Sequence, residues 1–492
     1  METIAHPREA DPESESIDTM PRGLIRGVVL LGCVILAVRI APLSVRGLRV
    51  DENLTAWVTS DSFSDSISRA YRYQGQSPLY FMGIWVWRQL VGANESMLRL
   101  PSMLATLAIL WRIRVFVRGW LSDAGSWLAV GLGAGVLLLG DGPVAARPYV
   151  FGALALVIAT EHAVRWSEND SLRSGMSWCA ASVVALYMHP FVFFAVAGQG
   201  ALILITKPEL RRQMVVVAAT GAALCLPIVP QVLSLGQRQE SLVLVDQPSF
   251  GQLVFALLQP TLLVPVVLCG AAARFLGTLR APRLGHIPGA VWVWAFAPQI
   301  GVFAYSHLSG SSIFILRYFG FALPALAMIA AAILIDLRPP VIALAGLAIS
   351  VAITVASFLT PIETQWSLAA EVVNDRSAGV VFASAGFVEA ADADFIRGDA
   401  VDYLNAPLLN YGVTGPIEAL PLHLDNNNDA FVRGLVQEYR SLERIVVVER
   451  VGVRDAINYR EELGGLMRTT GGYELVEAID DADGLRISVY ER

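Results

Sequence analysis

Seven ionisable side chains near the ends of long apolar segments are the residues of this sequence best suited to chemistry. They are Asp51, Arg99, Asp141, Arg147, His189, His307 and Arg317. The placement of Lys and Arg around the apolar segments puts all seven on one side of a membrane. Because charge is costly in hydrocarbon, such a convergence usually marks a site. A carboxylate that faces several guanidinium groups combines a base with a binding site for an anion such as phosphate.

The composition requires a membrane. Of the 492 residues, 55% are hydrophobic and only 16% are charged, and the mean hydropathy is +0.55, which is typical of a multi-pass membrane protein. The net charge of -7 and the lack of a basic stripe exclude nucleic acid as a partner. The four cysteines all lie inside apolar segments, so we interpret them as core residues rather than a disulfide or metal framework.

About eleven apolar segments have the length that a membrane helix needs. They are 24–42, 98–118, 123–140, 146–165, 174–188, 190–206, 213–235, 252–278, 289–306, 313–336 and 339–359. Residues 1–22 are polar and acidic without a cleavage pattern, so the first segment is expected to remain as a signal anchor with a cytoplasmic N-terminus. The sequence therefore predicts a polytopic α-helical protein of the inner (plasma) membrane.

The segment Ser77–Gly92 decides the topology because it is apolar and aromatic but short, with Arg88 near its middle. If it lies in the membrane interface, the basic clusters face the cytoplasm, as the positive-inside rule requires. These clusters are Arg112/Arg114/Arg118, Arg165/Arg173, Lys207/Arg211/Arg212, Arg274/Arg280/Arg283 and Arg338. If it spans the membrane, they face outward. We take the interfacial arrangement, in which the C-terminal part of the chain is external (periplasmic).

Three units follow from this topology. A polar cytoplasmic tail (1–22) precedes a transmembrane domain (23–360), and an external domain (361–492) follows it. The first external loop, 45–98, is expected to hold amphipathic or interfacial helices at 53–59, 63–73 and 78–91. Alternating short β-type and helical stretches after residue 360 predict a soluble α/β domain. Its expected strands are Gly379–Ala385, Ile445–Glu449, Tyr473–Val476 and Leu485–Tyr490, and its expected helices are 429–442 and 453–467.

The adjacent pair Asp51 and Glu52 follows the first apolar segment. Neighbouring side chains of a helix start diverge, so one carboxylate can serve the reacting atoms while the other turns toward a metal, a lipid or the backbone. The pair also fits a purely structural role, with Asp51 as N-cap and Glu52 as a favourable charge for the helix dipole. The nearby arginines favour a base beside a phosphate site.

Arg147 and Tyr149 open one predicted span, and Arg317 and Tyr318 stand near the external end of another. Both arginines can reach a phosphate at headgroup depth. Snorkelling of a long cationic side chain to the interface explains each of them singly. Weaker signals come from His189 and His307, which also fit capping or core roles, and from Asp141, which can pair with Arg147 or cap a helix.

Six sequence fragments occur in the order found in the GT-C membrane glycosyltransferases. They are VDEN, QSPLYF, ESMLRLPSMLATL, AARPYVFGALAL, YMHPFVFF and RYFGFALPALA. Over about residues 20–340, the chain resembles the protein-mannosyltransferase and aminoarabinose-transferase branch of that superfamily. Family members usually carry an acidic residue or His before a PPLYY-like segment, whereas this chain has Gln76 and Ser77 there, so the contacts to the acceptor stay open.

The resemblance implies a GT-C-like fold and transfer of a sugar from a polyprenyl-phosphate donor to a glycan, lipid or protein acceptor on the external face, with inversion at the anomeric carbon. Asp51 becomes the candidate base, and the candidate phosphate ligands are Arg147, Arg317, Tyr149 and Tyr318. Possible supporting residues are Glu52, Gln76, Arg99, Asp141 and His189. A divalent cation such as Mg²⁺ or Mn²⁺ is left open, with no ligands assigned.

Two other functions compete with the enzyme. A transporter or flippase for a lipid-linked sugar would also place cations near a phosphate, but the sequence offers no obvious pair of broken helices for a pathway. A non-catalytic scaffold could use the external domain as its binding module. Removal of the Asp51 carboxylate distinguishes the three, because only the transferase needs it as a base.

Overall fold

The computed structural model describes most of the chain. The described residues are 46–74, 77–137, 144–237, 246–275, 284–337, 366–391, 401–423, 426–451, 457–480 and 484–492, with residues 23, 26, 27, 30, 34, 37, 348, 396 and 398. Gln76, Asp141, the segment 339–359 and most of the segment 24–42 lie outside this part. The expectations that concern them are therefore not addressed by the structure.

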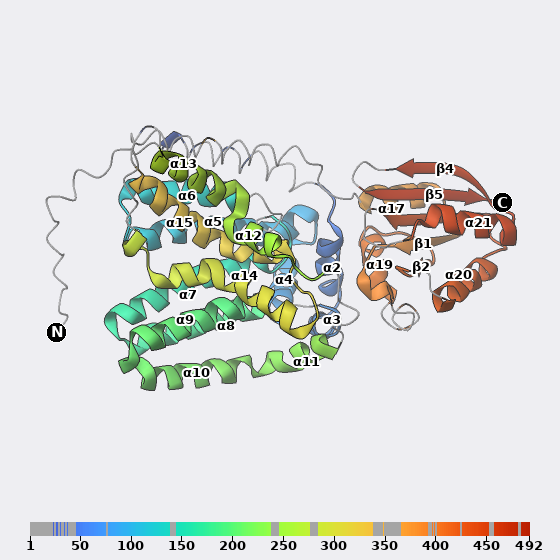
Figure 1. Cartoon of the computed structure of the whole chain (residues 1–492). Coiled ribbons are helices and arrows are strands. Elements are labelled where there is room, and N and C mark those ends of the chain that lie inside the picture. The colour runs from blue at the N-terminus through green and yellow to red at the C-terminus, as the bar shows by residue number, and fades with distance from the viewer. Residues whose placement is uncertain are drawn as a thin grey trace.

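A bundle of long helices forms the larger part of the molecule (Figure 1). Its main members are α5 (Glu95–Val117), α6 (Asp123–Leu137), α7 (Tyr149–Asn169), α8 (Leu172–Met188), α9 (Val192–Thr206), α10 (Arg211–Cys225), α14 (Gly289–Ser309) and α15 (Leu323–Asp336). Each coincides with a predicted apolar segment. Their facing sides form one continuous hydrophobic core, in which α15 is buried almost all round. A helix with so little polar surface is stable inside a bundle or membrane and not at a water interface.

Among the described residues, three helical stretches are both long and apolar enough to cross a membrane. They are Glu95–Val117, Pro208–Leu233 and Leu316–Asp336. The second is largely unburied within the protein and exposes Val215, Val216 and Leu233. Exposed aliphatic side chains along a helix of this length fit contact with lipid rather than with water.

Two predicted spans are interrupted in the structure. The first changes from α10 to a 3₁₀ turn, η3 (Leu226–Ile228), and then to α11 (Val229–Gln237). The second changes from α12 (Phe250–Leu258) through a π-helical turn, η4 (Gln259–Leu263), to α13 (Val264–Phe275). Each break contains a proline, which cannot donate the backbone hydrogen bond of a regular helix. Apolar length alone does not reveal such breaks.

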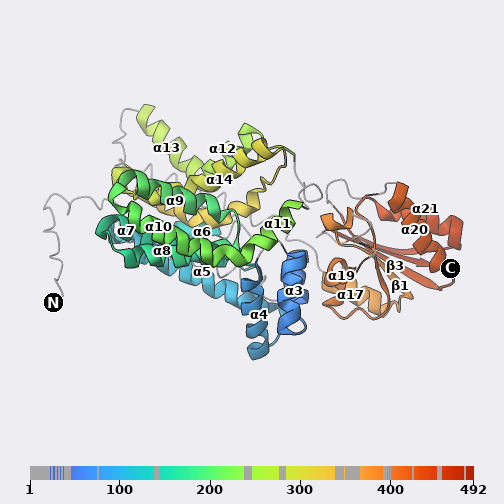
Figure 2. The ribbon, with the colours of Figure 1, turned by 90° about the horizontal axis from the view of Figure 1, so that it is seen from below.

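Three short helices cap one end of the bundle (Figure 1). They are α2 (Val50–Val58), α3 (Phe63–Tyr73) and α4 (Pro78–Val91), so the helices predicted from periodicity are present, with α2 beginning earlier than expected. Figure 2 shows two of them, α3 and α4, side by side. Ser62 accepts the Asp65 N–H and starts α3. Ser77 and Pro78 start α4, with proline at a position where its missing N–H costs no bond.

The C-terminal part is a three-layer α/β unit. Its strands are β1 (Val380–Ser384), β2 (Ile417–Ala419), β3 (Arg444–Arg450), β4 (Glu474–Asp480) and β5 (Leu485–Glu491), in the order β2-β1-β3-β5-β4. β1 pairs parallel with β2 and β3, and β5 runs antiparallel to β3 and β4. The four predicted strands are all present. The short strand β2 is the one that the sequence did not indicate.

Helices cover both faces of this sheet. α17 (Trp366–Asp375) and α19 (Val401–Leu409) pack on one face, and α20 (Asn426–Glu438) and α21 (Tyr459–Gly471) pack on the other. Alternate residues of β1 point to opposite faces, so Val381 joins one core and Phe382 the other. Burial on both faces explains the apolar runs of β1 and β3.

The α17 and α19 face shares a hydrophobic core with α2 and α4. At the contact, the ring of Tyr403 lies 5.9 Å from Trp57 and 5.3 Å from Tyr73. Phe387, which follows β1, lies 5.2 Å from Tyr403, so the carboxyl end of β1 faces the helical bundle (Figure 1). The α/β unit is therefore packed firmly against the end of the bundle that carries α2.

Candidate active site

The Asp51 side chain stands in the first turn of α2 and keeps 39% of its surface exposed. The Nη1 atom of Arg317 lies 3.7 Å from Asp51 Oδ2, and Arg147 Nη1 donates to the Asp51 main-chain oxygen over 3.1 Å. Burial acts to raise the pKa of Asp51, but the nearby guanidinium groups together lower it further. Arg450, at the end of β3, and Arg49 add to this effect, so the pKa lies below its usual value of 3.8.

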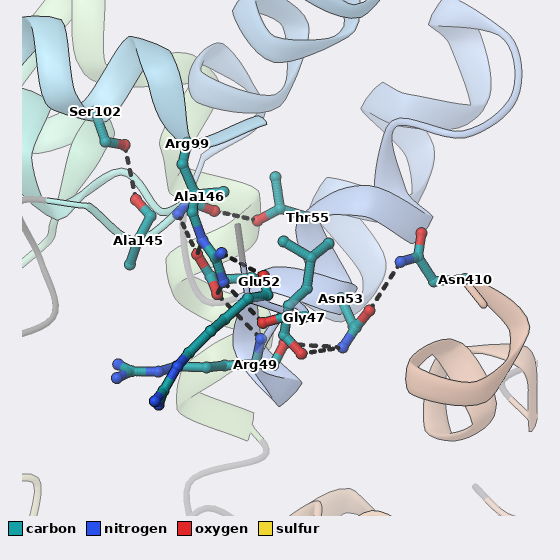
Figure 3. Close-up of polar contacts among 12 residues, drawn as sticks. Gly47, Arg49, Glu52, Asn53, Thr55, Arg99, Ser102, Ala145, Ala146 and Asn410 are labelled. Carbon is teal, nitrogen blue, oxygen red and sulfur yellow. Dashed lines mark hydrogen bonds and ion pairs between the residues drawn. The ribbon is translucent and has the colours of Figure 1, made fainter. Parts of the chain in front are cut away.

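Arg147 is fixed by the turn that precedes α7. In this turn the Thr55 hydroxyl donates to Ala146 O over 2.8 Å, and the Ser102 hydroxyl donates to Ala145 O over 2.7 Å (Figure 3). The Arg147 side chain is only 6% exposed. Bonds from both α2 and α5 therefore hold the backbone from which Arg147 reaches Asp51.

Gln74, the residue that ends α3, adds a contact that sequence reasoning missed. Its Oε1 accepts a hydrogen bond from Arg147 Nη1 over 3.2 Å. The Gln74 Nε2 group is buried without a partner among the described residues, although buried amide groups normally have one. Gln74 thus adds a buried amide donor, unpaired among the residues that the structure describes, next to the Asp51–Arg147 pair.

Glu52, unlike its half-exposed neighbour Asp51, is buried and forms an ion pair with Arg99. Figure 3 shows Glu52 and Arg99 pointing toward one another. Arg99 donates from Nε to Oε1 over 2.8 Å and from Nη2 to Oε2 over 2.5 Å. The backbone N–H groups of Ala146 and Arg49 also donate to this carboxylate, over 2.9 and 3.0 Å. Both charged side chains are almost fully buried. Glu52 and Arg99 therefore form a buried structural ion pair, called the Glu52–Arg99 brace below. In the pair Asp51 and Glu52, it is Glu52 that turns toward the backbone and has the structural role.

The helix cap also differs from one expectation. Arg49, not Asp51, is the N-cap residue of α2, and Glu52 accepts the N-cap N–H. Hydrogen bonds from Arg99 and from the backbone lower the pKa of Glu52 against the effect of burial, which raises it. Glu52 thus remains a carboxylate, and Asp51 is released from any capping role.

An aromatic cluster borders the two arginines. Tyr149 lies 5.6 Å from the His189 ring and 6.3 Å from Tyr318, and the guanidinium groups of Arg147 and Arg317 lie beside Tyr149 and Tyr318. His189, between α8 and α9, is buried, and burial with the charge of Arg147 lowers its pKa to about 3. Its imidazole is therefore neutral and leaves the positive charge of the site to the arginines.

The predicted candidates thus divide into two groups. Asp51, Arg147, Arg317, Tyr149, Tyr318 and His189 come together at the α2 end of the bundle. His307 does not join them, because its Nε2 contacts the main-chain oxygen of Pro248 at 3.0 Å. Arg450 also belongs to the site, because its positive charge helps to lower the pKa of Asp51. The two residues are about 400 positions apart, so no local sequence pattern links them.

The charges around Asp51 suit an anion better than a metal ion. The described groups that act most strongly on it are guanidinium groups, which bind phosphate and carboxylate oxygens. The described residues contain no cluster of three or more His, Cys, Asp or Glu side chains that could hold a metal. In this geometry Asp51 can accept a proton from a bound hydroxyl group. Arg147 and Arg317 can stabilise the negative charge of a bound anion.

No family model and no curated protein matches the sequence. Solved structures do match it. ArnT from Cupriavidus metallidurans in the apo state has a TM-score of 0.52 at 16% identity, covering 95% of this chain and 98% of that chain. The same protein bound to undecaprenyl phosphate has a TM-score of 0.51 at 16% identity, covering 94% and 97%. An oligosaccharyltransferase from Archaeoglobus fulgidus matches less well, with a TM-score of 0.48 at 13% identity over 86% and 69%.

The two ArnT matches establish the fold. They extend over nearly the whole chain and include the C-terminal α/β unit. The GT-C resemblance inferred from sequence fragments over about residues 20–340 is therefore confirmed at the level of the fold, and it reaches further along the chain than those fragments.

Proposed function

We propose that this protein is an inverting glycosyltransferase that moves a sugar from a polyprenyl-phosphate donor to a glycan, lipid or protein acceptor on the external face of the membrane. One observation carries the proposal: the half-exposed Asp51 carboxylate stands beside Arg147 and Arg317, which come from two different elements at one end of a GT-C fold. The ArnT structure that contains undecaprenyl phosphate supports a lipid-phosphate donor for this fold.

The proposed reaction is a single displacement. The Asp51 carboxylate accepts the proton of an acceptor hydroxyl, whose oxygen forms the new bond to the anomeric carbon. The bond between that carbon and the phosphate oxygen breaks, and its electron pair stays with the lipid phosphate. Arg147 and Arg317 stabilise the charge on the leaving phosphate. Because the phosphate leaves as an anion, no second carboxylic acid is needed, unlike in a glycoside hydrolase.

Donor binding prepares the base in this scheme. The contact between Arg317 and Asp51 is long, at 3.7 Å, and the Arg317 side chain is 59% exposed. A phosphate can therefore take over Arg317 with little loss of existing hydrogen bonding. Once its positive charge is neutralised by phosphate, the pKa of Asp51 rises, and the carboxylate becomes a better proton acceptor only when the donor is present.

The membrane arrangement belongs to the same proposal. About eleven spans, a cytoplasmic N-terminus and an external (periplasmic) α/β domain put Asp51 on the outer surface of the inner membrane, within a transmembrane domain of residues 23–360. Helix α4 exposes Leu79, Val86 and Leu90, which suits a helix in the membrane interface. The aromatic cluster around Tyr149 and Tyr318 would contact the first isoprene units, and a lateral groove for the rest of the lipid stays a prediction.

A transporter or flippase is the second candidate, and one observation favours it. The helices interrupted at η3 and η4 are features that transporters use to build substrate sites. Both breaks, however, are explained by their prolines. The position of a half-exposed carboxylate between cations is unnecessary for a flippase and central to a transferase.

Sugar transfer in membranes that contain the full chain tests the proposal. A panel of polyprenyl-phosphate sugars serves as donors, and total membrane extract supplies acceptors. The Asp51→Asn variant should lose transfer and keep donor binding, because it keeps its size and loses its base. Asp61→Asn is the matched control, since Asp61 lies just beyond α2, pairs with Arg69 and is exposed. Equal transfer by the intact chain and the Asp51→Asn variant would refute the proposal, and donor binding without transfer by either would favour transport.

A further inference from the structure

A cavity of about 530 Å³ lies at the other end of the helical bundle from Asp51. It is a partly open cavity, lined by the ends of α5, α7 and α9 and by the start of α14. Tyr149 of the candidate active site begins α7, whereas Glu161 of the same helix lines the cavity. At 1.5 Å per residue these two positions are about 18 Å apart along the helix, so the cavity and the active site are separate.

A buried carboxylate, Glu161, and one of its two arginine partners, Arg165, line the cavity, and the second partner, Arg112, lies behind Glu161. Glu161 is only 3% exposed and pairs with both Arg112 and Arg165, the latter at 2.5 Å. The Nε of Arg112 has no hydrogen-bond partner within the described part of the chain. Glu168, an exposed carboxylate at the rim, also lines the cavity. Two guanidinium groups against one buried carboxylate leave donor capacity for a further anion.

Other lining groups also donate hydrogen bonds. The Trp120 indole N–H is buried and has no acceptor among the described residues. Gly289 and Ala290, the first residues of the 21-residue helix α14, stand at the cavity, where helix N–H groups lack intrahelical acceptors and the dipole is positive. The His286 ring lies 6.2 Å from that of Trp120. Trp120, Arg165 and the start of α14 therefore supply hydrogen-bond donors to one part of the cavity, and the group that complements these donors is an anion.

The surroundings of the cavity indicate a ligand with hydrocarbon chains. Leu104, Leu107, Trp111 and Val115 form an exposed stripe along α5, at the spacing of one helix face. Val115, the last of them, also lines the cavity. A ligand whose charged group enters the cavity can thus lay an acyl chain along this stripe, which a soluble anion cannot do.

We propose that this cavity binds the phosphate group of an anionic glycerophospholipid from the membrane leaflet opposite the candidate active site. The phosphate accepts from Trp120, Arg165 and the start of α14, and an acyl chain lies on the α5 stripe. The lipid bridges α5, α7 and α14. At their other ends, α5 carries Arg99 and α7 begins at Tyr149, so the lipid ties together two helices that reach the candidate active site. The proposal does not depend on the reaction at Asp51.

Native mass spectrometry of the full chain in detergent tests this site, with phosphatidylglycerol, phosphatidylcholine and inorganic phosphate as probes. We expect phosphatidylglycerol to bind at least tenfold more tightly than phosphatidylcholine. Trp120→Phe and Arg165→Gln should each weaken that binding roughly tenfold or more, since each removes a hydrogen bond to a charged group. Glu168→Gln should leave it unchanged or tighten it.

Arg173→Gln is the matched control, because Arg173 belongs to the same basic end of the bundle but does not line the cavity. Thermal midpoints within a few degrees of the intact chain show that Trp120→Phe and Arg165→Gln are folded, and Trp120→Phe preserves most of the packing. Equal binding of the two lipids, or unchanged phosphatidylglycerol binding in both variants, would overturn the proposal. If inorganic phosphate saturates the site and displaces the lipid, the cavity is a site for a free anion and the lipid proposal is wrong.

Discussion

The buried Glu52–Arg99 brace gives the sharpest test of how the site is held. In Glu52→Gln the amide keeps the size of the side chain but removes the negative charge, and Arg99 is then left as a buried cation. Four hydrogen bonds end on the Glu52 carboxylate, two from Arg99 and two from the backbone. Loss of one partner of a buried ion pair costs about 3–5 kcal/mol of unfolding free energy.

The magnitude follows from exposure as well as from bond number. The two side chains are 2% and 4% exposed, so water cannot replace the lost charge. The Asp51 side chain, at 39% exposed and with one long ion pair, lacks these conditions. Asp51→Asn should therefore change stability far less than Glu52→Gln, although the two substitutions are adjacent and chemically identical in kind.

Thermal unfolding of the full chain in detergent, followed by tryptophan fluorescence, measures this contrast. Glu52→Gln and Arg99→Met should each lower the midpoint by several degrees. The double variant should lose less than the sum of the two, because it leaves no unpaired charge. A normal midpoint for Glu52→Gln would refute the brace, because a buried cation left without its partner must lower stability.

Three further predictions concern the site and its support. Because the pKa of Asp51 in the donor-free protein lies below 3.8, the base is ionised across the neutral range, and kcat/KM for the donor should not fall on mild acidification. Arg317→Met removes a cation and raises that pKa, so the acid loss of kcat/KM should move to higher pH. Asn410→Ala removes the hydrogen bond from the α/β unit to Asn53 (3.0 Å), and Tyr411→Phe removes the one to Leu48 N (2.5 Å). For each variant we expect kcat to fall several-fold with the donor KM unchanged. A changed KM with normal kcat would contradict this expectation. Gly47→Ala places a methyl group 2.8 Å from Ser367 Oγ and 3.2 Å from Tyr411 Oη, so its thermal midpoint should fall, and a second substitution, Ser367→Ala, should restore part of it.

Much of the secondary structure could be predicted because it depends on local patterns. Apolar length indicated the bundle helices, and the amphipathic or interfacial character of 63–73 and 78–91 indicated α3 and α4. Short β-type runs between helical stretches indicated β1, β3, β4 and β5. The short strand β2 and the breaks at η3 and η4 escaped, because three residues carry little periodicity and a proline in an apolar segment can either bend a helix or interrupt it.

The site could be predicted only in part, for a different reason. Asp51, Arg147 and Arg317 stood out because charge near the end of an apolar segment is unusual. The role of Glu52 depends on Arg99, which lies 47 residues later, and on a backbone N–H that lies 94 residues later. Gln74 is an ordinary polar residue at a helix end. Such partnerships are created by tertiary packing, and a single sequence does not encode them in its spacing.

Helix geometry links the opposite environments of Asp51 and Glu52. Successive residues of a helix are rotated by about 100°, so burying Glu52 against Arg99 necessarily turns Asp51 toward the open side of α2. The Glu52 carboxylate also holds the Ala146 N–H, directly before the arginine that reaches Asp51. The same buried anion thus orients both the candidate base and one of its cations. A substitution at Glu52 should therefore disturb the relative positions of Asp51 and Arg147 even where the chain remains folded, whereas a substitution at Asp51 should leave Arg147 in place.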